Sequence, residues 1–303
     1  MARVALVGGG GFIGRNLAET FSKAGHDVLV IARRGNVLPN HRVLASLEDT
    51  CCLFQAIESH RSEVVIHLAS GLLPSSNFAS FLAEQSVLMV PSYHLINHCA
   101  ERGLRFVLMS SGGAVYGDVG EQPVREDHAR VPKSFYAFSK LALEDYAFLC
   151  HRQQGLQYLV LRASNPYGKH QNPNGAQGIV AVSLGRALRG EPLEVWGDGS
   201  VVRDYLDVAD LAQAVVALVE AGTVNTVLNI GSGVGHSLEE LFRVVRHATG
   251  RSLSIVYRPG RGCDVRRIVL DTRALAQLIA WRPRSLESGV ESFSRWIADE
   301  HPQ

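Results

Sequence analysis

A tyrosine and a lysine four residues apart form the pair best suited to acid–base chemistry in this chain. They occur in Tyr136-Ala137-Phe138-Ser139-Lys140, within a predicted helix, so both side chains lie on one face, one turn apart. A phenol has a pKa of about 10, so a base working near pH 7 needs that pKa lowered by about three, which corresponds to about 4 kcal/mol. A neighbouring ammonium supplies part of this stabilisation. The alternative is an ordinary Tyr–Lys pair on a solvated helix face.

A glycine-rich turn near the start of the chain favours the chemical interpretation. The apolar run Val4–Val7 ends at Gly8, further glycines follow at Gly11 and Gly14, and an amphipathic helix is predicted over Phe12–Ala24. A strand that turns sharply into a helix, without side chains at the turn, lets a pyrophosphate approach bare backbone and the positive end of the helix dipole. The pattern therefore predicts a dinucleotide-binding site.

The elements that must position these groups alternate between strand and helix. Continuous apolar runs, rather than alternating ones, indicate parallel strands that are covered on both faces. We therefore predict an α/β fold with a Rossmann-type doubly wound parallel sheet, whose ligand lies across the carboxyl ends of the strands. The predicted strands are Val4–Val7, Val28–Ile31, Val64–Leu68, Phe106–Met109 and Tyr158–Leu161, and the predicted helices are Phe12–Ala24, Ser86–Arg102 and Phe135–Gln153.

The sequence changes character after residue 165, where prolines and glycines become frequent. We predict a dinucleotide-binding Rossmann domain over residues 1–165 and a smaller α/β substrate lobe over 166–303. A helix over Val208–Glu220 and a strand over Val227–Ile230 are expected to return to the main sheet, so the two regions interleave near 208–231. No internal repeat, low-complexity tract or long linker is present.

A series of further motifs stands in a fixed order along nearly the whole chain. With the glycine run and the Tyr136/Lys140 pair, they resemble the extended short-chain dehydrogenase/reductase family, in its NAD(P)-dependent nucleotide-sugar epimerase/dehydratase branch. These motifs are His67-Leu68-Ala69, Ser110-Ser111-Gly112-Gly113-Ala114-Val115-Tyr116-Gly117, Asn165-Pro166-Tyr167-Gly168, Gly197-Asp198-Gly199, Arg203-Asp204-Tyr205 and Asn229-Ile230-Gly231-Ser232-Gly233.

The resemblance implies a reaction and a set of site residues. Tyr136 takes the proton of a sugar hydroxyl, usually on C4, while hydride leaves the same carbon for a nicotinamide, and Lys140 holds the ribose. Asn165, Arg203 and Arg261, or less surely Arg258, bind the diphosphate, since guanidinium groups suit phosphate geometry. Trp196 stacks on the base or packs within the lobe, and Ile179 shapes the sugar pocket together with Leu72 and Leu73. The implied coenzyme-binding residues are Gly8, Gly11, Phe12, Ile13, Gly14, Arg33, Arg34, Leu47, Leu68, Ala69, Tyr136 and Lys140.

The chain departs from the family in the segment that precedes Tyr116. Members of the family carry a serine or threonine four residues before that tyrosine, and its hydroxyl bridges substrate and catalytic tyrosine, whereas this chain has Gly112. Ser111 is the nearest hydroxyl, and we predict that it or a water takes this role. Gly113 and Ala114 stand where dehydratases carry acids, so water elimination is disfavoured.

A second departure concerns the choice between NAD and NADP. Relatives that use NAD carry an acid at the end of the second strand, where this chain has Ala32-Arg33-Arg34. Two arginines attract a 2′-phosphate that a carboxylate would repel. NADP is therefore slightly favoured, although a solvated basic loop would still admit NAD.

Three functions follow from these patterns. The first is a UDP-sugar 4-epimerase that regenerates its coenzyme in each cycle. The second is an NADPH-dependent nucleotide-4-ketosugar reductase that makes a deoxysugar, which Arg33 and Arg34 favour because a released reductant is expected to be phosphorylated. The third is a catalytically silent coenzyme sensor, suggested by Gly112 but disfavoured because sensing needs no proton-transfer residue.

Composition restricts the class of partner. Thirty Lys and Arg nearly balance 29 Asp and Glu, so neither nucleic acid nor a membrane surface is an expected partner. No apolar run approaches the ~18 residues of a spanning helix, and a cytoplasmic location is expected. The five cysteines match no metal or disulfide pattern. His94 and His98 lack the glutamate of a zinc-protease motif, so we predict a surface or interface pair and no metal.

The family resemblance also implies a homodimer. Relatives pair the helices corresponding to Ser86–Arg102 and Phe135–Gln153 across a two-fold axis. The apolar side chains of Leu141, Tyr146, Phe148 and Leu149 would contribute to that interface.

Overall fold

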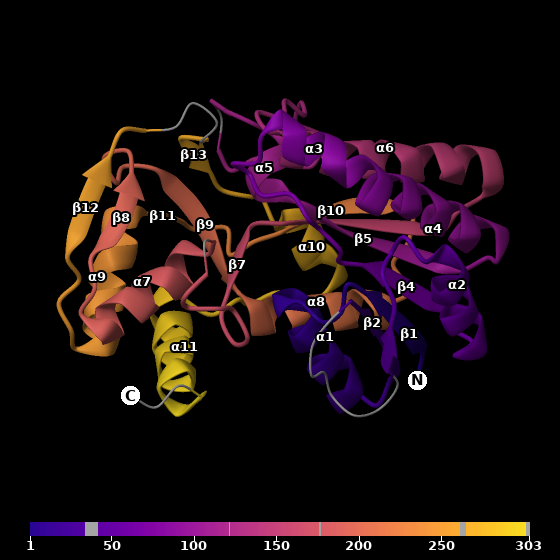
Figure 1. Ribbon diagram of the computed structural model, residues 1–303, viewed down its shortest axis with the longest axis horizontal. Coiled ribbons are helices and arrows are strands. Elements are labelled where there is room, and N and C mark those ends of the chain that lie inside the picture. The colour runs from indigo at the N-terminus through magenta and orange to yellow at the C-terminus, as the bar shows by residue number, and fades with distance from the viewer. Residues whose placement is uncertain (34–41, 121, 176, 261–264, 301–303) are drawn as a thin grey trace.

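The computed structural model of the chain describes residues 1–33, 42–120, 122–175, 177–260 and 265–300. Figure 1 shows a large lobe built on a central sheet and a smaller lobe beside it, with the N-terminus in the large lobe and the C-terminal helix in the small one. Two predicted site residues, Arg34 and Arg261, lie outside the described part of the chain.

Seven parallel strands form the sheet of the large lobe, in the order β10-β6-β5-β4-β1-β2-β3. Strand β10, from late in the chain, pairs with β6 at one edge, and β3, for which no strand was predicted, closes the other edge. The doubly wound parallel sheet expected from the sequence is confirmed. Its strands are β1 (Arg3–Val7), β2 (Asp27–Ala32), β3 (Arg42–Leu44), β4 (Val64–His67), β5 (Arg105–Ser111), β6 (Tyr158–Ala163) and β10 (Thr226–Ile230).

Helices bury both faces of this sheet, which explains the continuous apolar strands. On one face α1 (Phe12–Lys23) and α8 (Val208–Glu220) pack around Leu17, Phe21 and Leu211. On the other face lie α2 (Thr50–Ser59), α4 (Val90–Glu101) and α6 (Phe135–Gln154). Burial of each Leu or Phe side chain contributes about 1.5–3 kcal/mol to the free energy of folding, so the two helical layers stabilise the sheet.

The order of the strands reverses between β1 and β4. The chain runs outward from β1 to β3 and then crosses back to place β4 on the other side of β1. The carboxyl ends of these two strands therefore diverge into a crevice, which is where a doubly wound sheet binds its ligand.

The smaller lobe packs short strands against three helices. It contains the set β7, β9, β11 and β13, and a separate parallel pair, β8 and β12. Buried Leu184, Phe242 and Phe293 fill its core. The strands are β7 (Asn165–Tyr167), β8 (Leu193–Trp196), β9 (Val202–Asp207), β11 (Gly235–Ser237), β12 (Ile255–Arg258) and β13 (Arg267–Ile268), and the helices are α7 (Ile179–Arg189), α9 (Leu238–Thr249) and α11 (Leu286–Glu300).

Three short elements complete the description: α3 (Phe78–Glu84), α5 (Gly112–Val115) and α10 (Arg273–Leu278), the last of which contacts β10. The single helix predicted over Ser86–Arg102 is divided into a π-helical turn, Gln85–Met89, and α4. Pro91 lies in the first turn of α4, where its missing N–H is tolerated.

Two predictions about side chains are wrong. Leu141 is buried among Val115, Tyr116 and Leu270, so it is not available to a partner subunit. His98 is not on the surface, because it is buried with its ring stacked on Phe54 at a centroid distance of 4.1 Å. Among the described cysteines, Cys51, Cys52, Cys99 and Cys150 are free thiols. In the part of the chain that is described, no helix has both the length and the apolar character needed to span a bilayer.

Candidate active site

A hollow of about 540 Å³ lies at the carboxyl ends of β1, β2 and β4, at the reversal of the strand order. Six of the predicted coenzyme-binding residues line it: Gly8, Gly11, Arg33, Leu47, Leu68 and Ala69. The hollow thus lies where a doubly wound sheet binds a dinucleotide, and residues of the glycine motif line it.

The three glycines of the motif have different roles in this geometry. Gly8 has a φ of +85°, and a Cβ there would lie 2.7 Å from the backbone nitrogen of Ala69. A Cβ at Gly14 would lie 2.5 Å from the Cα of Gly9, so Gly14 serves close packing. A Cβ at Gly11 would meet only the carbonyl oxygen of Gly8, at 3.5 Å, and Gly11 lines the hollow. The cradle therefore has the space that a pyrophosphate requires, and the residues fit a dinucleotide.

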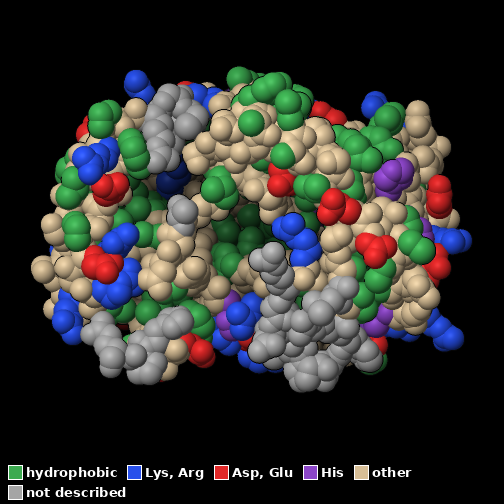
Figure 2. Space-filling model, viewed as in Figure 1, with side chains coloured by type: hydrophobic (Ala, Val, Ile, Leu, Met, Phe, Trp, Pro, Cys, Tyr) green, Lys and Arg blue, Asp and Glu red, His purple; other side chains and the backbone are tan. Residues whose placement is uncertain are grey.

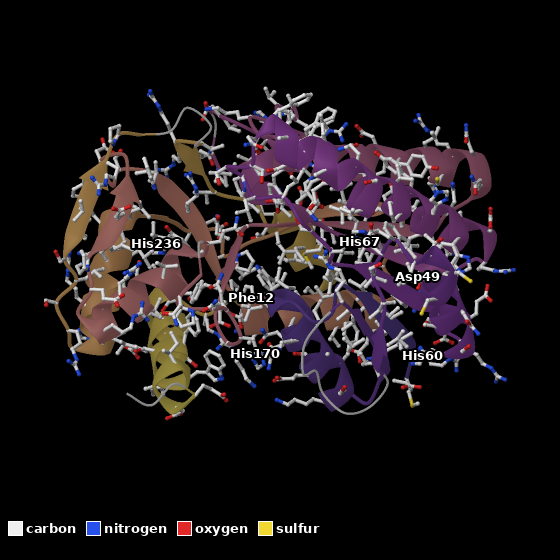
Figure 3. The ribbon with its side chains drawn as sticks, in the orientation of Figure 1. Phe12, Asp49, His60, His67, His170 and His236 are labelled. Carbon is white, nitrogen blue, oxygen red and sulfur yellow. The ribbon has the colours of Figure 1, made fainter. Side chains whose placement is uncertain are left out.

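Phe12 and Ile13, at the start of α1, have side chains in different places. Phe12 lines a second hollow, and Figure 3 shows it where the two lobes meet. The side chain of Ile13 packs against the core under α1 and is not among the groups that line the coenzyme hollow. A role in ligand binding is left to the backbone of Ile13, at the helix N-terminus.

Residues that were not predicted also line the coenzyme hollow. Glu48, which follows Leu47, lines the same hollow as Arg33 and brings a carboxylate to it, although the end of β2 itself carries no acid. Ser70 lines both the coenzyme hollow and the second hollow, so the two spaces adjoin. The sequence feature that could have identified Ser70 is its position directly after Ala69, just beyond the end of β4.

The second hollow, of about 580 Å³, opens between the lobes. Figure 2 shows the viewed face hollowed at its centre, with hydrophobic side chains on the floor. The predicted site residues that line it are Phe12, Ser111, Tyr136, Asn165, Ile179, Trp196 and Arg203, together with Leu72 and Leu73. Lining residues that the sequence did not predict include Gln171, Gln177, Tyr205 and Leu238.

Tyr136 is placed by the start of α6. The hydroxyl of Ser134 accepts a hydrogen bond from the backbone N–H of Ala137 at 3.2 Å and fixes the first turn. Tyr136 is half-buried in that turn and hydrogen-bonds Ser111 at the end of β5. Burial raises the pKa of Tyr136, and the bond to Ser111 acts against that rise. The lowered pKa expected from the sequence is therefore not a property of the chain without its coenzyme.

Lys140 lies one turn further along α6 and is buried, with 6% of its surface exposed. Its Nζ donates to the carbonyl oxygen of Met109 at 3.0 Å. Burial lowers the pKa of Lys140 to about 8, and the nearby carboxylate of Glu144 opposes that effect. The Lys140 side chain is thus buried within the protein, one helical turn along α6 from Tyr136.

His67, at the end of β4, is a neutral neighbour of Lys140. Its Nε2 lies 2.8 Å from Ser92 Oγ. Complete burial, with a contribution from the Lys140 ammonium, lowers the pKa of His67 to about 3. The imidazole therefore adds no second positive charge beside Lys140.

The groups predicted to hold a diphosphate come together around β9. The side-chain amide of Asn165 donates to the carbonyl oxygen of Asp204 at 3.1 Å, and Arg203 directly precedes Asp204 in β9. Trp196 is 41% exposed and lines the cleft. Arg258 is paired with Glu194 at 2.6 Å, which makes it a weaker second cation for the substrate.

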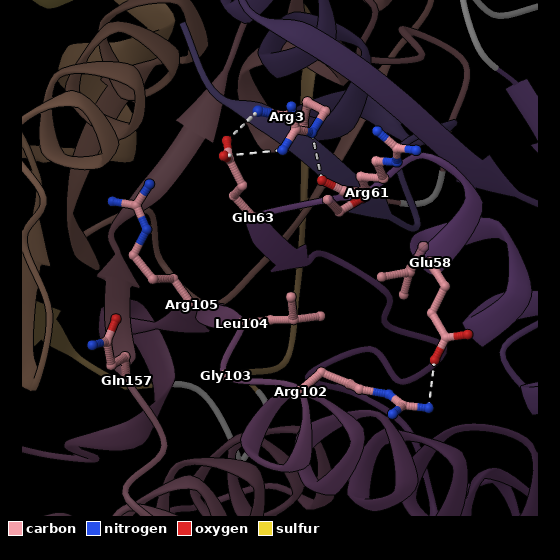
Figure 4. A pocket seen from close by; sticks show the side chains of 11 residues that line it. Arg3, Glu58, Arg61, Glu63, Arg102, Gly103, Leu104, Arg105 and Gln157 are labelled. Carbon is pink, nitrogen blue, oxygen red and sulfur yellow. Dashed lines mark hydrogen bonds and ion pairs between the residues drawn. The ribbon is translucent and has the colours of Figure 1, made fainter.

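A separate hollow of about 730 Å³ lies at the amino ends of β1, β4, β5 and β6, opposite the carboxyl ends that carry the cleft (Figure 4). Two of its arginines are neutralised locally, Arg3 by Glu63 at 3.2 Å and Arg102 by Glu58 at 2.8 Å. It contains none of the predicted site residues that are described. The cleft between the lobes is therefore the candidate active site.

Comparisons with known proteins agree with this placement. The model of the NAD dependent epimerase/dehydratase family matches residues 4–231. The chain is 29% identical to a putative UDP-glucose 4-epimerase of Methanocaldococcus jannaschii over 98% of this chain and 99% of that protein.

Two solved structures give the same result. A UDP-glucose 4-epimerase of Thermotoga maritima, crystallised with UDP-glucose, superposes with a TM-score of 0.93 at 32% identity, covering 98% of this chain and 99% of that one. The Thermus thermophilus UDP-glucose 4-epimerase in complex with NAD gives a TM-score of 0.90 at 30% identity, covering 97% and 98%. The chain belongs to the NAD dependent epimerase/dehydratase family, as an enzyme of its sugar-nucleotide epimerase type.

Proposed function

We propose that this protein is a UDP-sugar 4-epimerase with Tyr136 as its acid–base group. The observation that carries the proposal is the meeting of two spaces at Ser70: one carries the glycine cradle, and the other carries Tyr136 and Ser111. A sugar in the second space would have its reacting carbon between the phenol and the coenzyme. The similarity to UDP-glucose 4-epimerases supports a UDP-sugar as the substrate.

In the forward half-reaction Tyr136, as phenolate, accepts the proton of the sugar C4 hydroxyl. Ser111 hydrogen-bonds the tyrosine and orients it, and the buried Lys140 ammonium stabilises negative charge from one turn below. A nicotinamide coenzyme, held by the glycine cradle with Leu68 and Ala69, would supply reversible hydride transfer at C4. In the return half-reaction Tyr136 gives the proton back to the C4 oxygen.

An epimerase must present either face of C4 to the same hydride donor. Leu72, Leu73, Gly113 and Ala114 line the cleft near Tyr136, and none of them has a polar side-chain group that would hold the sugar in one orientation. Arg203 and Asn165, which we propose as the diphosphate anchor, come from the smaller lobe. A firmly held diphosphate and a weakly held sugar suit this requirement.

The alternative functions fit the cleft less well. Gly113 and Ala114 bring no acid for water elimination, and a sensor has no need for Tyr136 above a buried lysine. The net ketosugar reductase keeps one argument, the exposed Arg33 in the coenzyme hollow. This reductase is the second candidate function.

One assay separates these functions. Purified protein is incubated with UDP-glucose or UDP-N-acetylglucosamine, the product sugars are separated, and the absorbance of the nicotinamide is followed. Epimerisation without net turnover of coenzyme supports the proposal. Stoichiometric consumption of NADPH with a UDP-4-ketosugar would show the reductase instead, and the absence of turnover in both assays would contradict both enzymes.

We also propose that the coenzyme site accepts NADP. Arg33 is exposed at the rim of the hollow, and the last residue of β2 is Ala32, so no carboxylate stands at that strand end. Glu48, in the same hollow, opposes this preference. Glu84 is a second acid that lines the hollow, so we infer that both coenzymes bind, with Arg33 favouring the 2′-phosphate.

We propose a homodimer that uses the outer surfaces of α3, α4 and α6. Phe78, Leu82, Val90, Phe138 and Leu149 are exposed there by 38–58%. Single exposed apolar side chains are common, but five on adjacent helices indicate an interface. The remaining sequence predictions, a cytoplasmic location and the division into domains at residue 165, stay predictions.

A further inference from the structure

Gly112 follows Ser111 directly and has no room for a side chain. A Cβ at this position would lie 2.6 Å from Cδ1 and 3.0 Å from Cδ2 of Leu270, and 2.9 Å from the carbonyl oxygen of Arg162. Gly112 does not have a positive φ, so its backbone is not in the left-handed region that favours glycine. Space, and not backbone conformation, therefore requires glycine at this position.

Leu270 comes from a segment that is distant in sequence and is held firmly. Its side chain is fully buried, and its backbone N–H donates to Asp204 Oδ2 at 3.2 Å. Leu270 also forms a bridge with Val124, and the next residue, Asp271, donates its N–H to the Val124 carbonyl at 2.8 Å. The backbone of Leu270 is thus fixed by hydrogen bonds, and its buried isobutyl group lies against Gly112.

The second neighbour of Gly112 is equally fixed. Arg162 lies in β6, paired in register with Ser110 on one side and Asn229 on the other. Its carbonyl cannot move without disturbing the central sheet. A side chain at position 112 could be accommodated only if the first turn of α5 moved away from both Leu270 and β6.

We propose that Leu270 is a positioning residue for the acid–base step. By excluding any side chain at position 112, it leaves Ser111 as the residue that supplies a hydroxyl to Tyr136. This assignment rests on the proposed function, because it takes Tyr136 as the acid–base group. Leu270 acts only through Gly112 and Ser111.

The steric part is tested by thermal unfolding, without an activity measurement. Gly112→Ala overpacks the site and lowers the melting temperature by about 2–6 °C. In the Leu270→Ala background the same substitution has a smaller effect, because the clash with the Leu270 methyl groups is gone and only the contact with the Arg162 carbonyl oxygen, at 2.9 Å, remains. Ile268→Ala removes a side chain of similar burial from the same cluster and serves as the matched control, in which the effect of Gly112→Ala stays unchanged.

The functional part is tested by moving the hydroxyl. In the native background Ser111→Ala lowers kcat about tenfold or more, with the dissociation constant of the coenzyme unchanged. In the Gly112→Ser/Leu270→Ala background a serine stands at position 112, and adding Ser111→Ala lowers kcat less than about threefold. A merely structural Leu270 would not change the dependence of kcat on Ser111.

The outcomes distinguish a failure of the proposed function from a failure of the role proposed for Leu270. A native chain without epimerase activity on either UDP-sugar contradicts the proposed function, while the unfolding experiment still judges the clash with Leu270. Full activity of Ser111→Ala in the native background overturns the assignment of Ser111 and Leu270 alone. Equal effects of Gly112→Ala with and without Leu270, or an unchanged dependence on Ser111 in the serine-112 background, also overturn the positioning role.

Discussion

Arg162 and Glu144 form a buried ion pair directly behind the candidate catalytic lysine. Nη2 of Arg162 lies 2.7 Å from Oε2 of Glu144, and its Nε lies 3.2 Å from Oε1. Glu144 is one turn beyond Lys140 on α6, and Arg162 is in β6. Arg162 also donates to the hydroxyl of Tyr116 at 2.9 Å. The pair therefore connects the catalytic helix to the central sheet.

Glu144→Gln is expected to destabilise the protein strongly. It leaves the buried Arg162 guanidinium without its counter-charge, which costs about 3–5 kcal/mol of the free energy of unfolding. Urea denaturation measures the change. The matched control is Asp145→Asn on the same helix, which breaks an exposed pair with Arg130 and costs less than about 1 kcal/mol. Similar losses in the two variants would mean that burial of the pair is unimportant.

Lys140→Met is expected to stabilise the coenzyme-free protein while abolishing turnover. Burial lowers the pKa of Lys140 from 10.5 to about 8 in the folded chain. Between these values the unfolded chain binds the proton more tightly, so the charged lysine costs about 3 kcal/mol of stability below pH 8, and this cost disappears as the pH approaches 10.5.

The measurement for Lys140 is the difference in free energy of unfolding between Lys140→Met and the native chain, from pH 7 to 10.5. Taking this difference cancels the titration of other residues. It should be large and positive at pH 7 and small at pH 10.5. A difference that does not change with pH would show that the lysine is not desolvated.

Tyr136→Phe is expected to lower kcat by about 10²–10⁴-fold, because the proton of the sugar hydroxyl loses its acceptor. The coenzyme should bind with a dissociation constant within about twofold of the native value, since the ring is kept. Tyr146→Phe on the same helix removes a hydroxyl bonded to Asn97 and should leave kcat nearly unchanged. Native turnover in Tyr136→Phe would remove the proposed base.

Arg33→Ala is expected to weaken NADP(H) about tenfold, equivalent to about 1.4 kcal/mol, and NAD(H) less than about twofold. The reason is that only the 2′-phosphate carries the additional charge. Fluorescence titration gives both dissociation constants. Arg61→Ala, in the hollow at the amino ends of the strands, is the control for a general effect of charge. An equal effect of Arg33→Ala on the two coenzymes would contradict a contact with the 2′-phosphate.

Val90→Glu and Leu149→Glu are expected to shift the protein from dimer to monomer in sedimentation equilibrium. Each places a charge on the exposed apolar surface of α4 or α6. Val256→Glu, at a comparably exposed apolar position in the smaller lobe, should leave the dimer intact. A native protein that is monomeric at all concentrations would end the dimer proposal.

Much of the candidate site could be predicted from the sequence because its signals are local. The glycine cradle depends on space within a few residues, and the spacing of Tyr136 and Lys140 fixes their common helix face. The parallel sheet followed from continuous apolar strands. Such features need only the periodicity of strand and helix and the bulk of each side chain.

Tertiary structure decided what depends on distant neighbours. The pKa of Lys140 and the rise in that of Tyr136 come from burial under the rest of the fold, which spacing along a helix does not report. Glu48 entered the coenzyme hollow from a loop, and Leu141 turned inward. From the sequence alone, Gly112 could be described only as lacking the hydroxyl that relatives carry at this position. Only the approach of Leu270, 158 residues later, gives a physical reason for the glycine, because van der Waals exclusion depends on which atoms the fold brings together.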